Sequence, residues 1–280
     1  MRIVIALLII SILGNLFGLF ILYKFMKKQK YVDELQHNLA VQNGLLNDLA
    51  ANLPRQMLFL HHSVGRNWLN EGGLRDTLLS LGIGIRGATY GDDIGQETDI
   101  CHWAPKFRQD MKKIFKFKAH PNQYFNGDRE NDIIMFKSCF PNSDIVGDGV
   151  EPGDPAGGEK TLANYRATFA ALKEEFSGYP DKLFIYVTSP PLVPSETTAD
   201  RAGRARQFTD WISGEFASEY KQVTGLNNLL VFNLFDVLAD DGDYLRAEYR
   251  RSEHDSHPNA AGSKAATEKF LAFLREHQVL

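Results

Sequence analysis

The sequence is poor in cysteine. Its 280 residues include only two, Cys101 and Cys139, and neither belongs to a Cys-x-x-Cys pair or to a Cys/His zinc pattern. The two thiols are compatible with one disulfide or with two separate, partly buried side chains. Other residues that could bind a metal do occur, but no His-x-x-x-His spacing connects them. They are His61, His62, His102, Asp92, Asp93 and Asp99. We therefore expect neither a metal ion nor a cofactor.

The chain also lacks an excess of basic residues. Lys and Arg number 31 against 35 Asp and Glu, which gives a formal net charge of -4. Binding of nucleic acid requires a basic face, so nucleic acid is not expected as a partner. Low-complexity segments are absent as well. With 44% hydrophobic and 24% charged residues, the composition fits one ordinary globular domain and an additional N-terminal segment.

The N-terminal segment is long and apolar. Ile3–Tyr23 contains no charged residue and consists mainly of Ile, Leu, Val and Phe. About 20 apolar residues span the core of a bilayer. A cleaved signal peptide usually has a shorter apolar region, roughly 7–15 residues, followed by a small-residue cleavage site, and no such site follows here. The sequence therefore predicts an uncleaved transmembrane anchor over residues 1–26.

Residues 27–55 are predicted to form a helical stalk or linker. Apolar residues occupy a and d positions of a heptad register, which only Gln42 breaks. They are Val32, Leu35, Leu39, Leu46, Leu49 and Leu53. A short coiled coil would make the chain a homodimer through residues 31–54. A single amphipathic helix explains the pattern equally well. Pro54 ends the segment, and the main domain is predicted to cover residues 56–280.

The main domain alternates strand-like and helix-like segments. Strands are predicted at Met57–His61, Ile83–Ala88, Ile133–Ser138, Leu183–Thr188 and Leu229–Asn233. Helices are predicted at Trp68–Leu81, Thr161–Phe176, Arg201–Val223 and Ala260–His277. Such alternation is typical of an α/β fold in which helices cover both faces of a parallel sheet. We expect a three-layer, flavodoxin-like sheet of about five strands. Tyr90–Asn131 is interpreted as a long irregular loop, which could be functional or could hold a small satellite core of its aromatic side chains.

Polar residues follow the strands in four blocks, at 61–65, 90–98, 137–144 and 255–259. The first block, His-His-Ser-Val-Gly, places Ser63 after a buried strand. Open α/β sheets bind their ligands at the carboxyl ends of the strands. The last block contains Asp255 and His257, immediately before the final amphipathic helix. Together, these residues supply a nucleophile, a base and an acid that could orient the base.

The order and spacing of the four blocks resemble the SGNH (GDSL-type) hydrolase superfamily over about residues 56–280. The resemblance is greatest to the branch whose first block reads His-His-Ser-x-Gly in place of Gly-Asp-Ser. The segments Phe184–Leu192 and His257–Gly262 strengthen it. The resemblance implies that Ser63 is the catalytic nucleophile, that His257 is the base and that Asp255 orients it. It also implies an oxyanion hole formed by a glycine of the second block and an asparagine of the third.

Some of these assignments have alternatives. Ser63 could simply begin a helix, which is compatible with a nucleophilic role. The family's acid lies three residues before the histidine, and His254 occupies that position here, whereas Asp255 lies two before. Asn142 is the predicted side-chain donor of the oxyanion hole, but Pro-Asn-Ser is also a good turn sequence. Gly95 is chosen as the glycine, with Gly87 and Gly91 as the other candidates.

We therefore expect a membrane-anchored serine hydrolase that cleaves an ester of a small molecule or a glycan, for example an O-acetyl group. An acyltransferase that uses the same triad is the alternative enzyme, and a degenerate domain that only binds a glycan or a partner is the alternative binding protein. The resemblance places the domain outside the cytoplasm. The lysines after the apolar segment favour the cytoplasmic side by the positive-inside rule. They are Lys24, Lys27, Lys28 and Lys30.

Overall fold

The computed structural model describes residues 24, 27–34, 37 and 52–280, and the chain divides into two units, Met1–Leu49 and Ala50–Leu280. In the first unit, residues 27–34 are helical, and Gln29 Nε2 donates a hydrogen bond to Asp33 Oδ1 at 2.8 Å. The predicted anchor and most of the heptad pattern lie outside the described residues. Within the described ranges, no helix has both the length and the apolar character required to cross a membrane.

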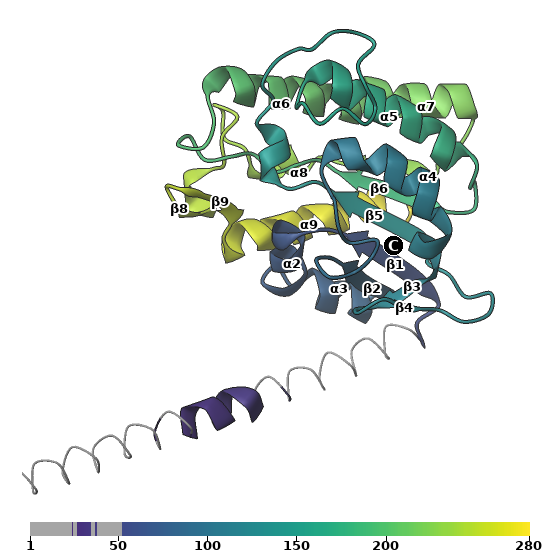
Figure 1. Ribbon diagram of the computed structural model, residues 1–280, viewed down its shortest axis with the longest axis vertical. Helices are drawn as coiled ribbons and strands as arrows, with labels where there is room; N and C mark the ends of the chain where they lie inside the picture. The colour runs from purple at the N-terminus through teal and green to yellow at the C-terminus, as the bar shows by residue number, and fades with distance from the viewer. Residues whose placement is uncertain (1–23, 25–26, 35–36, 38–51) are drawn as a thin grey trace, which may run out of the picture. The chain divides into compact units, whose positions relative to one another are not determined.

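The second unit is built on a five-stranded parallel sheet (Figure 1). Its strand order is β2-β1-β5-β6-β7, and every neighbouring pair is parallel. The strands are β1 Arg55–Leu60, β2 Ile83–Ala88, β5 Ile133–Lys137, β6 Leu183–Val187 and β7 Leu229–Phe232. The five predicted strands are thus confirmed. Their nearly continuous apolar sequences follow from burial on both faces of the sheet.

Helices cover both faces of the sheet. Alternate strand residues point to opposite faces, so Leu58 and Leu60 belong to one buried cluster while Met57 and Phe59 belong to the other. The first face is covered by α4 Ile100–Lys116, α5 Leu162–Ser177, α6 Ala199–Trp211 and α7 Ala217–Thr224. The second is covered by α2 Ser63–Asn70, α3 Leu74–Ser80, α8 Leu234–Leu238 and α9 Ala260–Glu276. The three-layer α/β prediction is therefore confirmed.

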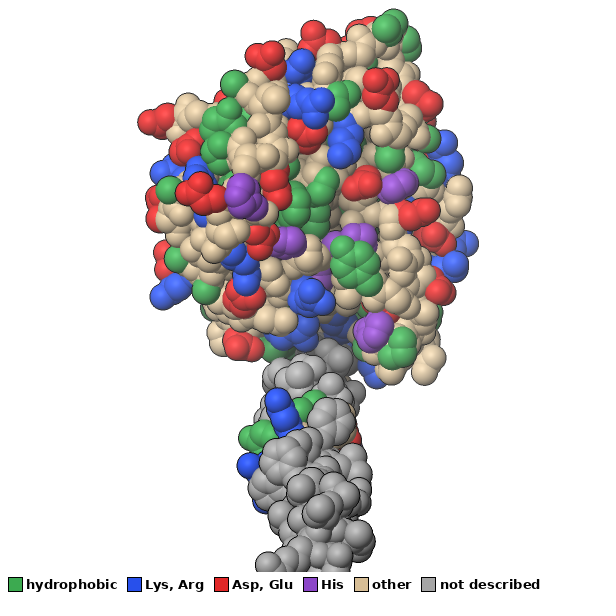
Figure 2. All heavy atoms as spheres, turned by 60° about the vertical axis from the view of Figure 1, so that its left-hand side comes forward, with side chains coloured by type: hydrophobic (Ala, Val, Ile, Leu, Met, Phe, Trp, Pro, Cys, Tyr) green, Lys and Arg blue, Asp and Glu red, His purple; other side chains and the backbone are tan. Residues whose placement is uncertain are grey.

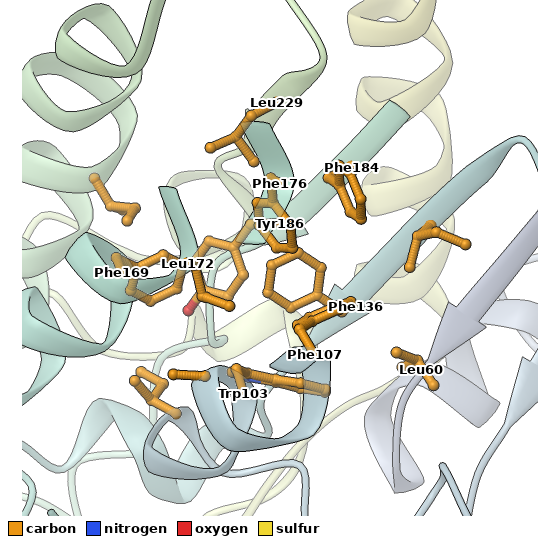
Figure 3. Close-up of a cluster of buried hydrophobic side chains, with 14 of the residues drawn as sticks. Leu60, Trp103, Phe107, Phe136, Phe169, Leu172, Phe176, Phe184, Tyr186 and Leu229 are labelled. Atoms are coloured by element: carbon orange, nitrogen blue, oxygen red, sulfur yellow. The ribbon is translucent and has the colours of Figure 1, made fainter. Parts of the chain in front are cut away.

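Aromatic side chains dominate the core of the first face (Figure 3). Phe107 of α4 meets Phe136 of β5 edge to face, with ring centroids 5.0 Å apart. Phe176 of α5 stacks on Phe184 of β6 at 4.0 Å. Large rigid rings bury much apolar area and have few rotamers to lose. This core therefore holds α4 and α5 firmly against the strands that lead to the site.

The interpretation of Tyr90–Asn131 as an irregular loop is wrong. This region contains the 17-residue helix α4 and a short hairpin of β3 Phe117–Ala119 and β4 Gln123–Tyr124. The apolar residues that α4 buries recur at helical spacing. They are Ile100, Trp103, Ala104, Phe107, Met111, Ile114 and Phe115. Pro105 in the second turn removes one backbone donor without ending the helix. The aromatic residues thus belong to the main core.

Two predicted helices need correction, and one hairpin was not predicted. The helix predicted at Trp68–Leu81 is divided into α2 and α3 at a Gly-Gly pair, and Gly73 adopts a φ of 66° that favours glycine. The helix predicted at Arg201–Val223 is interrupted by a π-helical segment, η2 Ile212–Phe216, between α6 and α7. The region before α9 forms an antiparallel hairpin of β8 Arg250–Ser252 and β9 Asp255–Pro258. This hairpin bears directly on the site.

Candidate active site

Ser63 lies at the junction between the central strand β1 and helix α2. After β1, the backbone N–H of His61 still donates to Ala88 O of β2 at 3.0 Å, and Ser63 is the first residue of α2. The first backbone N–H groups of a helix have no acceptor within the helix. The N-terminal end of the helix also carries a partial positive charge. The half-buried Ser63 hydroxyl therefore sits beside unsatisfied N–H groups that favour a developing negative charge.

Gly65 has a steric role in this block. A Cβ atom at this position would lie 2.4 Å from His61 Cβ, which no real structure tolerates. His61 is fully buried, and its ring also fills the space above Gly87, where an added Cβ would lie 2.4 Å from its Nε2 atom. The His-His-Ser-x-Gly sequence thus allows a buried histidine to pack directly against the first turn of the nucleophile helix.

Ser63, His257 and Asp255 form a hydrogen-bonded series. Ser63 Oγ lies 2.8 Å from His257 Nε2, although the two residues are 194 positions apart. On the other side of the imidazole, His257 Nδ1 lies 2.6 Å from Asp255 Oδ1. An ionised carboxylate can only accept a hydrogen bond. Nδ1 therefore carries the hydrogen, and Nε2 is the free base that faces the serine. This is the arrangement of a nucleophile, a base and an orienting acid.

The unusual spacing of Asp255 and His257 is explained by the strand β9. Residues two apart in an extended strand point to the same side, whereas a helix or a turn would bring residues three apart together. Asp255 and His257 are two apart in β9, and Asp255 Oδ1 also accepts the backbone N–H of His257 at 2.9 Å. His254 instead contacts Ser195 Oγ at 3.1 Å. The two-residue spacing therefore does not misdirect the carboxylate.

The pKa of Asp255 is lower than its ordinary value of 3.8. Partial burial alone would raise this pKa, but the hydrogen bonds from the backbone and the ring of His257, together with the charge of that ring, outweigh the effect. Asp255 therefore stays ionised under all but strongly acidic conditions. An ionised carboxylate holds the Nδ1–H tautomer and stabilises the imidazolium that forms when His257 accepts a proton.

Asn142 is buried at the carboxyl end of β5, in the short 3-10 helix η1 Phe140–Ser143. Its Oδ1 atom accepts the backbone N–H of Ile100 at 2.9 Å, and its Nδ2 atom donates to Asp99 Oδ1 at 2.7 Å. The second Nδ2 bond, to Cys139 O, is long at 3.3 Å. The side chain thus joins η1 to the first turn of α4. Of the two Nδ2 hydrogen bonds, only the one to Cys139 O is weak enough to be replaced by a bond to another acceptor.

We expect Asn142→Ala to change both stability and turnover. The variant leaves the Ile100 N–H without its acceptor, and a buried unsatisfied group typically costs about 1–3 kcal/mol. A role for Nδ2 at the oxyanion predicts an additional loss of roughly 10²–10³ in kcat. Urea unfolding and ester hydrolysis measure the two effects separately. A loss of stability with parental kcat in the folded fraction would show that Asn142 acts only as a turn residue.

Gly95 does not offer the free backbone N–H that the sequence prediction required. Its N–H donates to Asp92 O at 3.0 Å. A Cβ atom at Gly95 would lie 2.0 Å from Thr89 O, so the close approach of these two backbone segments explains the glycine. The Gly95 carbonyl lies 2.8 Å from His62 Nε2. In this structure, Gly95 therefore shapes the loop after β2 and holds His62.

Two residues of the third block, Lys137 and Cys139, had no role predicted from the sequence. Lys137 is fully buried at the end of β5, and its Nζ atom donates to Ser138 O at 2.9 Å and to Cys139 Sγ at 3.5 Å. Cys139 Sγ lies 4.0 Å from Ser63 Oγ. Burial lowers the pKa of Lys137, although the neighbouring sulfur opposes this effect. A lysine that ends an otherwise apolar strand is the sequence signal that could have identified this group.

Aromatic and histidine side chains surround the triad. Phe140 meets the ring of His257 edge to face, with centroids 4.8 Å apart. His62 stacks on Tyr90 at 3.8 Å. Figure 2 shows histidines and hydrophobic side chains around a hollow on one face of the molecule. Cys101 and Cys139 are both free thiols, and no group of three or more candidate metal ligands occurs in the part of the chain that the structure describes.

Burial lowers the pKa of His61 from 6.5 to about 3, and the bond to His62 O opposes this effect only in part. The unfolded chain binds a proton at His61 below pH 6.5, whereas the folded chain does so only near pH 3. Stability is therefore lost as the pH falls from 6.5 towards 3. We expect His61 to account for about 2 kcal/mol of lost unfolding free energy between pH 7 and pH 5. Urea unfolding of the parent and of His61→Asn at both pH values measures this, and equal pH dependence in the two proteins would contradict it.

Comparison with known proteins adds a similarity of fold. No family model and no curated protein matches the chain. Among solved structures, a GDSL-like lipase from Bacteroides thetaiotaomicron is 11% identical, covers 79% of this chain and 88% of its own length, and superposes with a TM-score of 0.48.

Other similar structures have different described activities. A family two carbohydrate esterase from Clostridium thermocellum, solved with cellohexaose, is 10% identical, with 80% of this chain and 64% of that chain covered and a TM-score of 0.45. The periplasmic domain of a lipopolysaccharide acetyltransferase from Salmonella Paratyphi A is 10% identical, with 84% and 88% covered and a TM-score of 0.41. At these values, the similarity carries no conclusion about chemistry. The chemistry of this site follows from its side chains.

Proposed function

We propose that this protein is an SGNH-type serine hydrolase that transfers the acyl group of an ester to water. The observation that carries the proposal is the hydrogen-bonded series from Ser63 Oγ through His257 to Asp255, with atom separations of 2.8 and 2.6 Å. The three side chains come from two distant parts of the chain and meet at the carboxyl edge of the sheet. A purely structural role explains neither the free Nε2 atom nor its direction towards a half-buried hydroxyl.

The reaction would proceed in two halves. Ser63 Oγ attacks the ester carbonyl carbon while its proton passes to His257 Nε2, and the carbonyl oxygen becomes an oxyanion. The intermediate then collapses, the C–O bond to the alcohol breaks, and His257 returns the proton to the leaving oxygen. Water next attacks the acyl-Ser63 ester and gives a proton to His257. The second collapse releases the carboxylic acid and restores the Ser63 hydroxyl.

Asp255 and the N-terminus of α2 supply the electrostatic part of this mechanism. Asp255 stays ionised and opposes the positive charge that His257 carries in each tetrahedral intermediate. The first N–H groups of α2 have no acceptor within the helix and are available to the carbonyl oxygen that Ser63 makes negative. Donors and dipoles that are already oriented need no reorganisation during the reaction, which is why they lower its barrier.

The acyl acceptor and the substrate class are part of the proposal. The family resemblance of the sequence blocks favours an O-acetyl ester on a glycan or a small molecule. The full-length chain in detergent should be reacted with a fluorophosphonate, in the presence of EDTA, and the labelled peptide should contain Ser63. Release of acetate from p-nitrophenyl acetate and from an acetylated polysaccharide should then be compared. Absence of both labelling and acetate release would refute the proposal, and transfer of acetyl to an added alcohol in place of water would identify a transferase.

The apolar segment Ile3–Tyr23 is proposed to anchor the enzyme to a membrane with its catalytic domain outside the cytoplasm. Four lysines after the segment oppose this orientation by the charge rule, so the side must be measured. We expect external protease to digest the domain on intact cells or spheroplasts. Digestion only after lysis would place the domain in the cytoplasm. Self-association through residues 31–54 is a further proposal, which sedimentation of the chain with and without this segment tests.

A further inference from the structure

Ser256 separates the two catalytic residues of β9, and its side chain lies on the other side of the strand. Successive side chains of an extended strand alternate between its two sides. Asp255 and His257 are half-buried, whereas Ser256 is completely buried, with 0% of its surface exposed. The proposed mechanism does not use the Ser256 hydroxyl. A buried hydroxyl is costly unless it is hydrogen-bonded, so its partners show what this side of β9 is held against.

The Ser256 hydroxyl bonds twice to a turn formed by residues 193–196. It accepts the backbone N–H of Val193 at 2.9 Å, and it donates to the carboxylate of Glu196. The turn is closed by the Glu196 N–H, which donates to Val193 O at 3.0 Å, and Pro194 occupies the second position, which favours proline. Val193 is buried in the core of the second face of the sheet. The turn is therefore a fixed support for β9.

The strand β9 needs this support because its own pairing is short. In the part of the chain that the structure describes, β9 pairs with β8 in a separate two-stranded sheet, whose register shifts between Arg250 and Ser252. A two-stranded ribbon is only marginally stable by itself. Ser195 Oγ of the same turn also donates to Glu253 O, in the loop between β8 and β9. The 193–196 turn thus contacts both β9 and the loop that leads into it.

The backbone of Ser256 sets the geometry of the catalytic pair. Asp255 Oδ1 accepts the backbone N–H of His257 at 2.9 Å and lies 2.6 Å from Nδ1 of its ring. Both bonds span Ser256, so a rotation of its backbone would move the carboxylate relative to the imidazole. We propose that Ser256 is a positioning residue, whose bonds to the 193–196 turn fix β9 so that His257 stays directed at Ser63. This inference rests on the proposed function, and Ser256 acts only through the catalytic pair.

The Ser256→Ala variant tests the inference, because it removes both bonds and adds no volume. Displacement of a catalytic group by about 1 Å can cost roughly 100-fold in rate, so we expect kcat to fall by roughly 10- to 100-fold. KM for a short aryl ester should change little, since the hydroxyl is buried on the far side of the strand. NMR gives a direct readout of position. The Nδ1 proton of His257, held in the 2.6 Å bond to Asp255, should resonate far downfield of the amide protons, and this resonance should shift or broaden in the variant.

Tyr220→Phe is the matched control. Tyr220 is 1% exposed, and its hydroxyl donates to Asn228 Oδ1 at 2.6 Å, next to the amino end of β7 and thus at the edge of the sheet opposite the site. Each variant removes a buried hydroxyl and leaves a buried partner unsatisfied, so urea unfolding should show a loss of stability in both. Only Ser256→Ala should lower kcat and change the downfield resonance.

Glu196 allows a second test that does not disturb the core, because its side chain is exposed. Glu196→Gln keeps an oxygen that can accept the Ser256 hydroxyl and should retain most of the parental kcat. Glu196→Ala removes that acceptor and should lower kcat by about tenfold. The pair decides the question if Ser256→Ala does not fold, and equal kcat in the two Glu196 variants would then overturn the inference.

The outcomes separate this inference from the proposed function. A parent protein that neither hydrolyses esters nor reacts with a fluorophosphonate overturns the proposed function and the inference together. An active parent, with parental kcat and an unchanged downfield resonance in folded Ser256→Ala, overturns the inference alone. Equal losses of kcat in Ser256→Ala and Tyr220→Phe also overturn it, because the loss would then come from general destabilisation.

Discussion

Replacement of Ser63 by alanine should abolish ester hydrolysis and leave the fold intact. Ser63 Oγ is the atom that would bond to the acyl carbon, and its only hydrogen bond to the triad is the 2.8 Å bond to His257 Nε2. Loss of the nucleophile or the base of a triad typically lowers kcat by a factor on the order of 10⁴–10⁶. His257→Ala should therefore be as inactive as Ser63→Ala, and the double variant should lose little more. The measurement is the initial rate on a short-chain aryl ester.

The folded state must be monitored in the same experiment. The lost bond between Ser63 and His257 should lower the unfolding free energy by only about 1 kcal/mol, because both groups remain accessible to water. Ser80→Ala is a suitable control. The hydroxyl of this exposed serine donates to Thr77 O, one turn earlier in α3. A folded Ser63→Ala protein with near-parental turnover would contradict the triad and the proposed function.

The second large effect is expected for Asp255→Asn. The amide has nearly the shape of the carboxylate, but it has no charge, and its NH₂ group can turn towards His257 Nδ1. The imidazole would then carry its hydrogen on Nε2 and could no longer accept the proton of Ser63. Comparable substitutions in serine protease triads lower kcat by about 10⁴. We expect a loss of similar order here, because Asp255 Oδ1 lies 2.6 Å from Nδ1.

A matched variant tests the spacing argument. His254 occupies the position at which the family's acid is expected, but its ring contacts Ser195 Oγ rather than His257. His254→Ala should therefore retain most of the parental kcat. If His254→Ala is impaired and Asp255→Asn is not, the two-residue spacing does not orient the base. A loss of less than about tenfold in Asp255→Asn would likewise show that the acid is dispensable.

The positions of the strands could be predicted from the sequence because of their environment. A parallel strand that is covered on both faces contains apolar residues almost continuously, as Met57–Leu60 and Ile133–Phe136 do. Polar residues directly after such a run mark the carboxyl edge of the sheet. Helix α4 was missed for a different reason. Its aromatic residues were interpreted as part of an irregular loop, although the buried residues recur at helical spacing.

The oxyanion donors show the limit of reasoning from residue types. Gly95 was chosen because residues 94–98 resemble the family's Gly-Asp-Thr turn, whereas the structure uses this glycine for a close backbone approach to Thr89. Whether a backbone N–H is free depends on its acceptor, however, and the acceptor of Gly95 N is Asp92 O, in the same turn. Tyr90 had no predicted role, since its stacking on His62 follows from the register of β1 and β2.

The sequence by itself determined the α/β class, the edge of the sheet at which the site lies, and the identity of Ser63 and His257 as a candidate pair. These features depend on local patterns of apolar and polar residues, which neighbouring positions in the chain define. Only the tertiary structure decided that Ser63 and His257 meet across 194 residues and that β9 directs Asp255 to the same imidazole. Distances and hydrogen-bond partners of this kind depend on how the strands pair and how the helices pack, and residues far apart in the chain jointly define them.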